Sequence, residues 1–130
     1  MKVILDTNLL VAAFWNRRSA SAGILDDCLE GRLSLVYTAA IKREVARILR
    51  HAQASQAYRA KIDRLLDSSL EVEPATATVT TEDPEDQKFL ECAVASEADF
   101  LITNDEHLLR LRGVDRTAIV TPTQFRRLTR

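Results

Sequence analysis

The stretch Lys2-Val3-Ile4-Leu5-Asp6 is a short apolar run that ends on an acid. A second run, Leu33 to Tyr37, leads toward Glu44, and a third, Phe100 to Thr103, ends two residues before Asp105. A buried parallel strand reads as a continuous hydrophobic run, and open α/β sheets bind ligands beyond the carboxyl ends of their strands. Carboxylates that meet there repel one another. The pattern therefore predicts a positively charged partner, and a hard divalent cation with oxygen ligands satisfies that need.

Strand-like and helix-like segments alternate along the whole chain. Helices are expected at residues 9–14, 19–30, 39–51, 56–69, 83–97 and 106–111 and from residue 122 onward, and strands at 2–5, 33–37, 70–73, 100–103 and 118–120. No internal repeat or linker-like stretch interrupts the pattern. This alternation predicts a three-layer α/β/α sandwich, with a central parallel sheet of about five strands, in a single domain spanning residues 1–130.

The composition is that of an ordinary globular protein. The chain has 130 residues, of which 46% are hydrophobic and 28% charged, enough to bury roughly two-thirds of the unfolded surface. Cys28 and Cys92 lack any metal-site spacing and are expected to be buried thiols. We expect a cytoplasmic protein with no membrane partner, because no signal peptide is evident and the longest apolar run, Leu9 to Trp15, is too short to span a bilayer.

The net charge of −1 does not decide for or against a nucleic-acid partner, but the basic residues are concentrated in two stretches. The first comprises Lys42, Arg43, Arg47, Arg50, Arg59, Lys61 and Arg64, and the second Arg110, Arg112, Arg116, Arg126, Arg127 and Arg130. Basic stretches on either side of an acidic site suit a phosphodiester substrate, whose phosphates they can neutralise. The alternative, solvated helix faces with no ligand, stays open at this point.

Two acids lie where a helix should pack inward. Glu44 follows Ile41 by three residues and precedes Ile48 by four, and Asp86 begins the apolar stripe that continues through Phe89. An unpaired, ionised carboxylate in an interior costs several kcal/mol or shifts its pKa. Both acids therefore require a partner.

Together with the two acids at strand ends, they predict a pocket of four carboxylates. Its members are Asp6, Glu44, Asp86 and Asp105. Each acid has a local alternative. Either strand-end acid could cap the helix that follows it, Asp86 could complete a capping arrangement with Asp83, and Glu44 could pair with an arginine such as Arg47. These are separate coincidences, and the pocket needs only one explanation.

Other chemistry finds little support in the sequence. G-x-S-x-G and H-E-x-x-H are absent, and with three glycines a phosphate-cradling loop is not expected. His51 and His107 are isolated; His51 suits a helix end, and His107, two residues past Asp105, could touch a substrate. Oxygen-only ligation favours Mg²⁺ or Mn²⁺ over zinc, as one or two ions.

Several motifs resemble those of one known family. They are Val3-Ile4-Leu5-Asp6-Thr7-Asn8, Glu44 in its helix, residues 82–91 (EDPEDQKFLE), residues 101–105 (LITND) and the pair Leu108-Leu109. In these motifs the chain resembles the PIN-domain ribonucleases, in particular the small bacterial toxins of VapBC-type toxin–antitoxin modules. The resemblance spans nearly the whole chain.

The resemblance implies a metal-dependent endoribonuclease. It assigns metal binding and catalysis to Asp6, Glu44, Asp86 and Asp105, and substrate or supporting contacts to Asn8 and Thr103, with Asp83 as the reserve for Asp86. It further implies a homodimer inhibited by a cognate antitoxin whose C-terminal segment occupies the site. Asn104 stands where many relatives have glycine, and asparagine tolerates the positive φ that such a turn can require.

Two other functions compete with this interpretation. One is a catalytically inactive domain of the same fold that only binds RNA or protein, which the presence of all four acids disfavours. The other is a receiver-type signalling domain that binds Mg²⁺. Such a domain needs paired acids after its first strand, an aspartate after its third and a lysine after its fifth, but Asp6, Glu73-Pro74 and Val120-Thr121-Pro122 stand there.

Overall fold

A computed structural model describes residues 1–129 of the chain. Its strands are β1 (Lys2–Leu5), β2 (Ser34–Tyr37), β3 (Leu70–Glu71), β4 (Phe100–Ile102), β5 (Gly113–Val114) and β6 (Thr117–Val120). They form one six-stranded sheet in the order β3-β2-β1-β4-β6-β5. Every neighbouring pair is parallel except β5 and β6. The sheet is therefore parallel with one short antiparallel edge strand.

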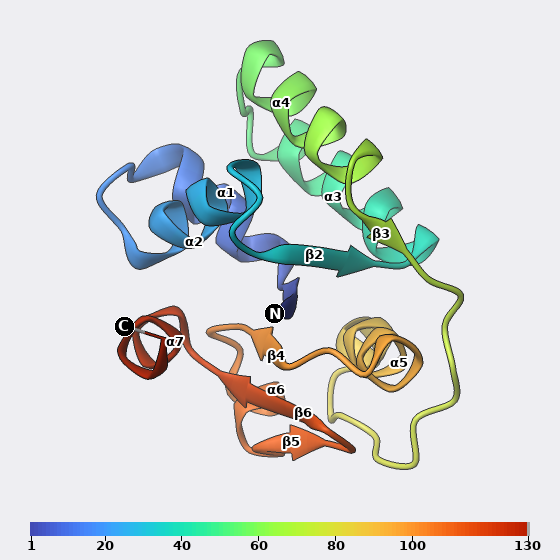
Figure 1. Cartoon of the computed structure of the whole chain (residues 1–130). Helices are drawn as coiled ribbons and strands as arrows, with labels where there is room; N and C mark the ends of the chain where they lie inside the picture. The colour runs from blue at the N-terminus through green and yellow to red at the C-terminus, as the bar shows by residue number, and fades with distance from the viewer. Residues whose placement is uncertain (130) are drawn as a thin grey trace.

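Helices cover both faces of this sheet. They are α1 (Thr7–Trp15), α2 (Ala20–Leu29), α3 (Ala39–His51), α4 (Gln56–Asp67), the 3₁₀ helix η1 (Pro84–Asp86), α5 (Gln87–Ser96), α6 (Glu106–Leu109) and α7 (Pro122–Leu128). Figure 1 shows α1, α2 and α7 together on one side of the sheet and α5 on the other, where it contacts β1 and β2. Helix α3 contacts α1, α4 and α5. The expected three-layer α/β/α sandwich is confirmed.

The central strands are continuous apolar runs because helices bury them from both sides. Val3 and Ile4 of β1 are fully buried, as are Leu101 and Ile102 of β4. The register pairs Leu5 with Ile102, so β1 and β4 end side by side. Whatever follows these two strands is consequently brought together at one edge of the sheet.

Some segments end earlier than expected, such as β3 at Glu71 instead of residue 73 and α6 at Leu109 instead of residue 111, and three further differences concern local geometry. The helix expected from Asp83 to Glu97 is split, with 3₁₀ geometry over η1 before α5 begins at Gln87. Strand β5 was not expected, because two residues are too few for a periodic pattern and the antiparallel turn is made by Asp115 at a φ of 50° with no glycine in it. The turn before Asp105 also needs no left-handed residue, since Asn104 is not among the residues of positive φ.

Both cysteines are buried free thiols, as expected, and burial raises the pKa of each to about 12.

Within residues 1–129, none of the helices combines the length and the apolar character needed to cross a bilayer.

Candidate functional site

Asp6 lies at the end of β1 and serves two purposes at once. Its Oδ1 accepts a hydrogen bond from the backbone N–H of Asn8 at 3.2 Å, which caps helix α1. Its Oδ2 accepts one from the hydroxyl of Thr103 at 2.6 Å. Asp6 is only 5% exposed. Burial raises the pKa of its carboxyl, the Thr103 hydrogen bond opposes that rise, and the charges of Glu44 and Asp105 add to it.

Thr103 ties the second strand-end acid to the first. Its hydroxyl oxygen accepts a hydrogen bond from the backbone N–H of Asp105 at 2.9 Å while its proton goes to Asp6. The side chain of Asp105 caps helix α6 through the N–H groups of His107 (2.7 Å) and Leu108 (3.4 Å). Thr103 is completely buried, so this bridge is shielded from water. Asp6 and Asp105 thus each cap a helix, and the hydroxyl of Thr103 links the two residues.

Glu44 reaches the same region from helix α3. One carboxylate oxygen accepts a hydrogen bond from the hydroxyl of Thr7, the residue after Asp6. The other lies 2.9 Å from the ammonium nitrogen of Lys88 on α5, and the two side chains are only 14% and 16% exposed. The ion pair of Glu44 is therefore with Lys88 and not with Arg47, the partner considered from sequence.

Asp86 and Asp83 come from the 3₁₀ helix η1 and behave differently. The Asp83 side chain caps η1 by accepting from the N–H of Glu85 at 3.0 Å. Asp86 makes no capping hydrogen bond, and its buried Oδ2 has no hydrogen-bond partner among the described residues. The capping arrangement considered for Asp86 is consequently wrong. Its carboxylate is free to serve something other than the backbone.

Electrostatics single out Asp86 among the acids. Burial contributes most to raising the pKa of its carboxyl to about 7, and the neighbouring carboxyl of Asp105 contributes next, followed by Asp6 and Asp83. Carboxylates held this close favour a shared proton or a cation over full ionisation. The pocket therefore has a deficit of positive charge that the chain does not fully supply.

One pocket of about 690 Å³ collects these groups. It is lined by Asp6, Thr7, Asn8, Glu44, Arg47, Ile48, Asp83, Glu85, Asp86 and Asp105. The four acids expected from sequence therefore line a single pocket, together with Asn8 and Asp83. Thr103 lies beneath it and touches it only through the two acids that it holds.

The donor set fits a hard divalent cation. The walls offer carboxylate oxygens, the ligand type that Mg²⁺ and Mn²⁺ prefer, and the orphaned Asp86 Oδ2 marks a place where a positive group is missing. Asp83, Asp86 and His107 each offer one ligand atom within 4.8 Å of the others, and this close group does not include Asp6, Glu44 or Asp105. A site of this kind can bind a cation and hold a phosphate against it.

Sequence reasoning overlooked Lys88 and considered His107 only as a possible substrate contact. Lys88 stands in the middle of an acidic motif, and a lone cation among acids is the signal that could have identified it. His107 lies two residues beyond Asp105, and its ring nitrogens lie 3.8 Å from Asp105 and 3.5 Å from Glu82. The contacts of Lys88 with Glu44 and of His107 with Glu82 join residues that are distant in the sequence, so only folding creates them.

The two basic stretches have different surroundings. In the second, Arg126 pairs with Asp27 at 2.9 Å, Arg110 with Glu82 at 3.4 Å, and Arg116 lies 3.9 Å from Glu97. These contacts match the alternative of ordinary helix-face charges. Arg130 lies outside the described residues. In the first stretch Arg47 is exposed and lines the acidic pocket, so it can meet a phosphate there.

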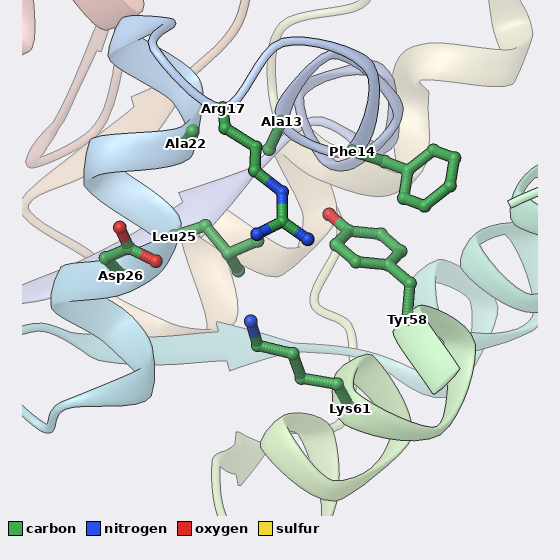
Figure 2. A pocket seen from close by; sticks show the side chains of 8 residues that line it. All are labelled: Ala13, Phe14, Arg17, Ala22, Leu25, Asp26, Tyr58 and Lys61. Atoms are coloured by element: carbon green, nitrogen blue, oxygen red, sulfur yellow. The ribbon is translucent and has the colours of Figure 1, made fainter. Parts of the chain in front are cut away.

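A second cavity lies between α1, α2 and α4 and has a different character (Figure 2). It measures about 110 Å³, and Figure 2 shows the side chains of Arg17, Asp26, Tyr58 and Lys61 gathered around it. The Tyr58 hydroxyl donates to the carbonyl of Leu10 at 2.6 Å. Cations outnumber the single acid here, so this cavity does not repeat the chemistry of the acidic pocket.

Comparisons with known proteins agree with this architecture. The family profile described as PIN domain matches residues 2–107. No curated protein matches the chain.

Three solved structures share the fold at low identity. VapBC2 from Rickettsia felis, crystallised with a DNA fragment from its promoter, is 14% identical with a TM-score of 0.63 over 93% of this chain and 98% of that one. PAE2754 from Pyrobaculum aerophilum is 20% identical with a TM-score of 0.57, over 98% and 89%. The PIN domain of T. brucei RRP44 is 15% identical with a TM-score of 0.53, over 96% of this chain and 78% of that one.

Proposed function

This chain belongs to the PIN-domain family, and on that premise we propose that it is a metal-dependent endoribonuclease acting as the toxin of a toxin–antitoxin pair. The observation that carries the proposal is the pocket of about 690 Å³ in which Asp6, Glu44, Asp86 and Asp105 gather from distant parts of the chain. Family membership also removes the receiver-domain interpretation.

Within this proposal, Asp6, Asp86 and Asp105 would hold Mg²⁺ or Mn²⁺. Glu44, which the resemblance also counts as a metal ligand, is paired with Lys88 and closes a further side of the pocket. The chemistry that such an ion supplies is Lewis-acid polarisation of the phosphodiester and activation of a water nucleophile. Hydrolysis adds that water across one P–O bond of the RNA. The orphaned Oδ2 of Asp86 and the raised pKa of its carboxyl support a cation at this place.

The protein's own groups prepare the site before any ligand arrives. Thr103 fixes the carboxylate of Asp6 and the backbone of Asp105 through one buried hydroxyl. Helices α1 and α6 start at these same two acids, so their backbone N–H groups restrain the carboxylates further. Arg47 and Asn8, both exposed at the pocket, are placed to contact an RNA backbone.

The partner and assembly proposed for the chain follow from the family. A toxin of this kind requires a cognate antitoxin, and the structural likeness to VapBC2, crystallised as a complex, supports that partner. A homodimer in the cytoplasm remains our expectation from the sequence. Light scattering of the purified chain measures the dimer directly, and a monomer at micromolar concentration would contradict it.

Cleavage of RNA by the purified protein tests the enzyme proposal. We expect fragments of a labelled RNA with Mn²⁺, none with EDTA, and none from Asp6→Asn. Cleavage that survives EDTA or persists in Asp6→Asn contradicts the mechanism. Binding of RNA without any cleavage by the wild type supports the inactive-domain alternative.

Expression in cells tests the toxin role separately. We expect growth arrest from the wild type and none from Asp6→Asn. A small open reading frame beside this gene, encoding a DNA-binding N-terminus, should relieve the arrest when it is co-expressed. RNA cleavage in vitro without growth arrest would support the proposed nuclease activity and contradict the proposed toxin role.

A further inference from the structure

Lys88 pairs with an acid of the pocket wall, Glu44, and the proposed function does not use this cation. The ammonium of Lys88 lies 2.9 Å from Glu44, 44 positions away in the chain, and both side chains are more than four-fifths buried. A pair so poorly hydrated is screened little by salt. The interaction therefore persists whatever the ionic strength outside.

Lys88 is anchored on several sides. Its ammonium donates to the backbone carbonyl of Glu85, lies 3.9 Å from the Glu85 carboxylate, and sits 5.4 Å above the ring of Phe89, which is 1% exposed. It is also the second residue of α5, where a positive charge opposes the helix dipole. Helix stability therefore does not explain this lysine, whereas the acids facing it do.

Glu44 differs from the other acids in having both oxygens engaged by the chain. Thr7 donates to one and Lys88 to the other. Asp86 by contrast keeps a buried oxygen without any partner among the described residues. The charge of Glu44 is compensated from within, and the uncompensated charge is concentrated toward Asp86 and its neighbours.

Two divalent ions in one nuclease site stand about 3.5–4 Å apart and need carboxylates on both sides to offset their repulsion. A fixed ammonium on Glu44 removes one of those carboxylates and repels a second ion approaching from that side. Resting on the proposed metal site, we propose that Lys88 is a positioning residue that occupies the place of a second cation, so that the pocket binds one divalent ion and not two.

Counting bound Mn²⁺ tests this inference without any activity measurement. Electron paramagnetic resonance of free Mn²⁺, titrated into metal-stripped protein, should give one ion per wild-type chain. Lys88→Met should bind two, because Glu44 is released, and Lys88→Arg should return the count to one. Lys61→Met, in the cavity between α1, α2 and α4, is the matched control and should stay at one.

A double variant shows whether Lys88 acts through Glu44. Lys88→Met combined with Glu44→Gln should bind one Mn²⁺, because the second ion then lacks its carboxylate. Two ions in the double variant, two in the wild type, or one in Lys88→Met would each overturn the inference.

The melting curve of Lys88→Met reports whether this variant folds. If it does not, Glu44→Gln alone still tests the inference. This variant should retain one Mn²⁺, and loss of that ion would overturn the inference. Failure of the proposed function has a different signature, since a wild-type chain that binds no Mn²⁺ rejects the metal site itself.

Discussion

Charged side chains gather both at the acidic pocket and at the cavity between α1, α2 and α4, but the sign of the charge in excess differs between them. Around the cavity, Arg17 and Lys61 face the single acid Asp26 (Figure 2). In the acidic pocket, carboxylates outnumber cations and one carboxyl has its pKa raised to about 7. The cavity therefore holds a small excess of cations, whereas the acidic pocket holds an excess of carboxylates with a raised pKa, and this second kind of imbalance indicates a ligand site.

The largest contrast between the two regions should come from removing one acid in each. Asp6→Asn is expected to lower Mn²⁺-dependent RNA cleavage by more than about 100-fold, beyond the effect usual for a supporting residue. It should also abolish the rise in melting temperature that Mn²⁺ produces. Asp26→Asn, the matched control at the cavity, should change neither quantity. Equal losses in both variants would show that the two regions are not distinct.

Thr103 allows a finer comparison, because its methyl and hydroxyl can be separated. Thr103→Val keeps the shape but removes the hydrogen bond to Asp6, and we expect Mn²⁺ affinity to fall by about 10- to 100-fold. Thr103→Ser keeps the hydroxyl and should retain most of the affinity. Calorimetric titration with Mn²⁺ measures both affinities. An unchanged Mn²⁺ affinity in Thr103→Val would show that Thr103 does not support the metal site.

The pH dependence of metal binding should follow the Asp86 carboxyl. Its pKa of about 7 in the metal-free protein means that a proton competes with the cation below that pH. Mn²⁺ affinity should then weaken by up to about tenfold for each pH unit below 7. Titrations at pH 6 and pH 8 test this, with zinc-free buffers of equal ionic strength. Affinity that is equal at both values would contradict the assignment.

Asp86→Asn should stabilise the metal-free protein at pH 8. The carboxyl has a higher pKa in the folded state than its ordinary value of 3.8, so folding favours its protonated form. That contribution is present below pH 4 and is lost as the pH rises through about 7. The amide variant avoids the loss, and melting in EDTA should occur a few degrees higher than in the wild type at pH 8.

The same comparison at pH 4 serves as the control for Asp86→Asn. There the wild-type carboxyl is largely protonated when folded, so the two melting temperatures should converge. A variant that melts lower than the wild type at pH 8 would show that the carboxylate already has a stabilising partner.

The smallest effect is expected at the cavity. Tyr58→Phe removes the hydrogen bond to the carbonyl of Leu10 and should cost about 1 kcal/mol of unfolding free energy. Mn²⁺ binding should not change, because Tyr58 does not line the acidic pocket. Urea denaturation measures the first quantity and calorimetry the second, and a change in Mn²⁺ affinity would link the two regions.

Much of the fold could be predicted from sequence because its signals are local. Helix α3 begins at Ala39 and ends at His51, as its apolar stripe predicts. Strand β5 could not be predicted, since two residues carry no period and its pairing with β6 is decided only when the turn closes. The 3₁₀ start of the helix after Asp83 was missed for a similar reason, because its sequence signals suit either helix type.

The acids of the pocket could be named from sequence, but not the partner of each. Glu44 stands out because it interrupts an apolar stripe, and Asp6 because it ends an apolar run. Glu44 pairs with Lys88 and not with Arg47, which is closer in the sequence, because of the way α3 and α5 pack against each other. Capping and site formation, which seemed to be alternatives for Asp6, occur together because its two oxygens face different donors.

The order of residues along the chain was sufficient to indicate the class of fold and which carboxylates are costly in their places, because apolar periodicity and misplaced charge are local properties. Only the tertiary structure decided which carboxylates are compensated, by Lys88 or Thr103, and which one, Asp86, keeps an oxygen without a partner among the described residues. The physical reason is that the electrostatic energy of a carboxylate depends on neighbours brought within a few ångströms by folding, and these neighbours lie far away in the sequence.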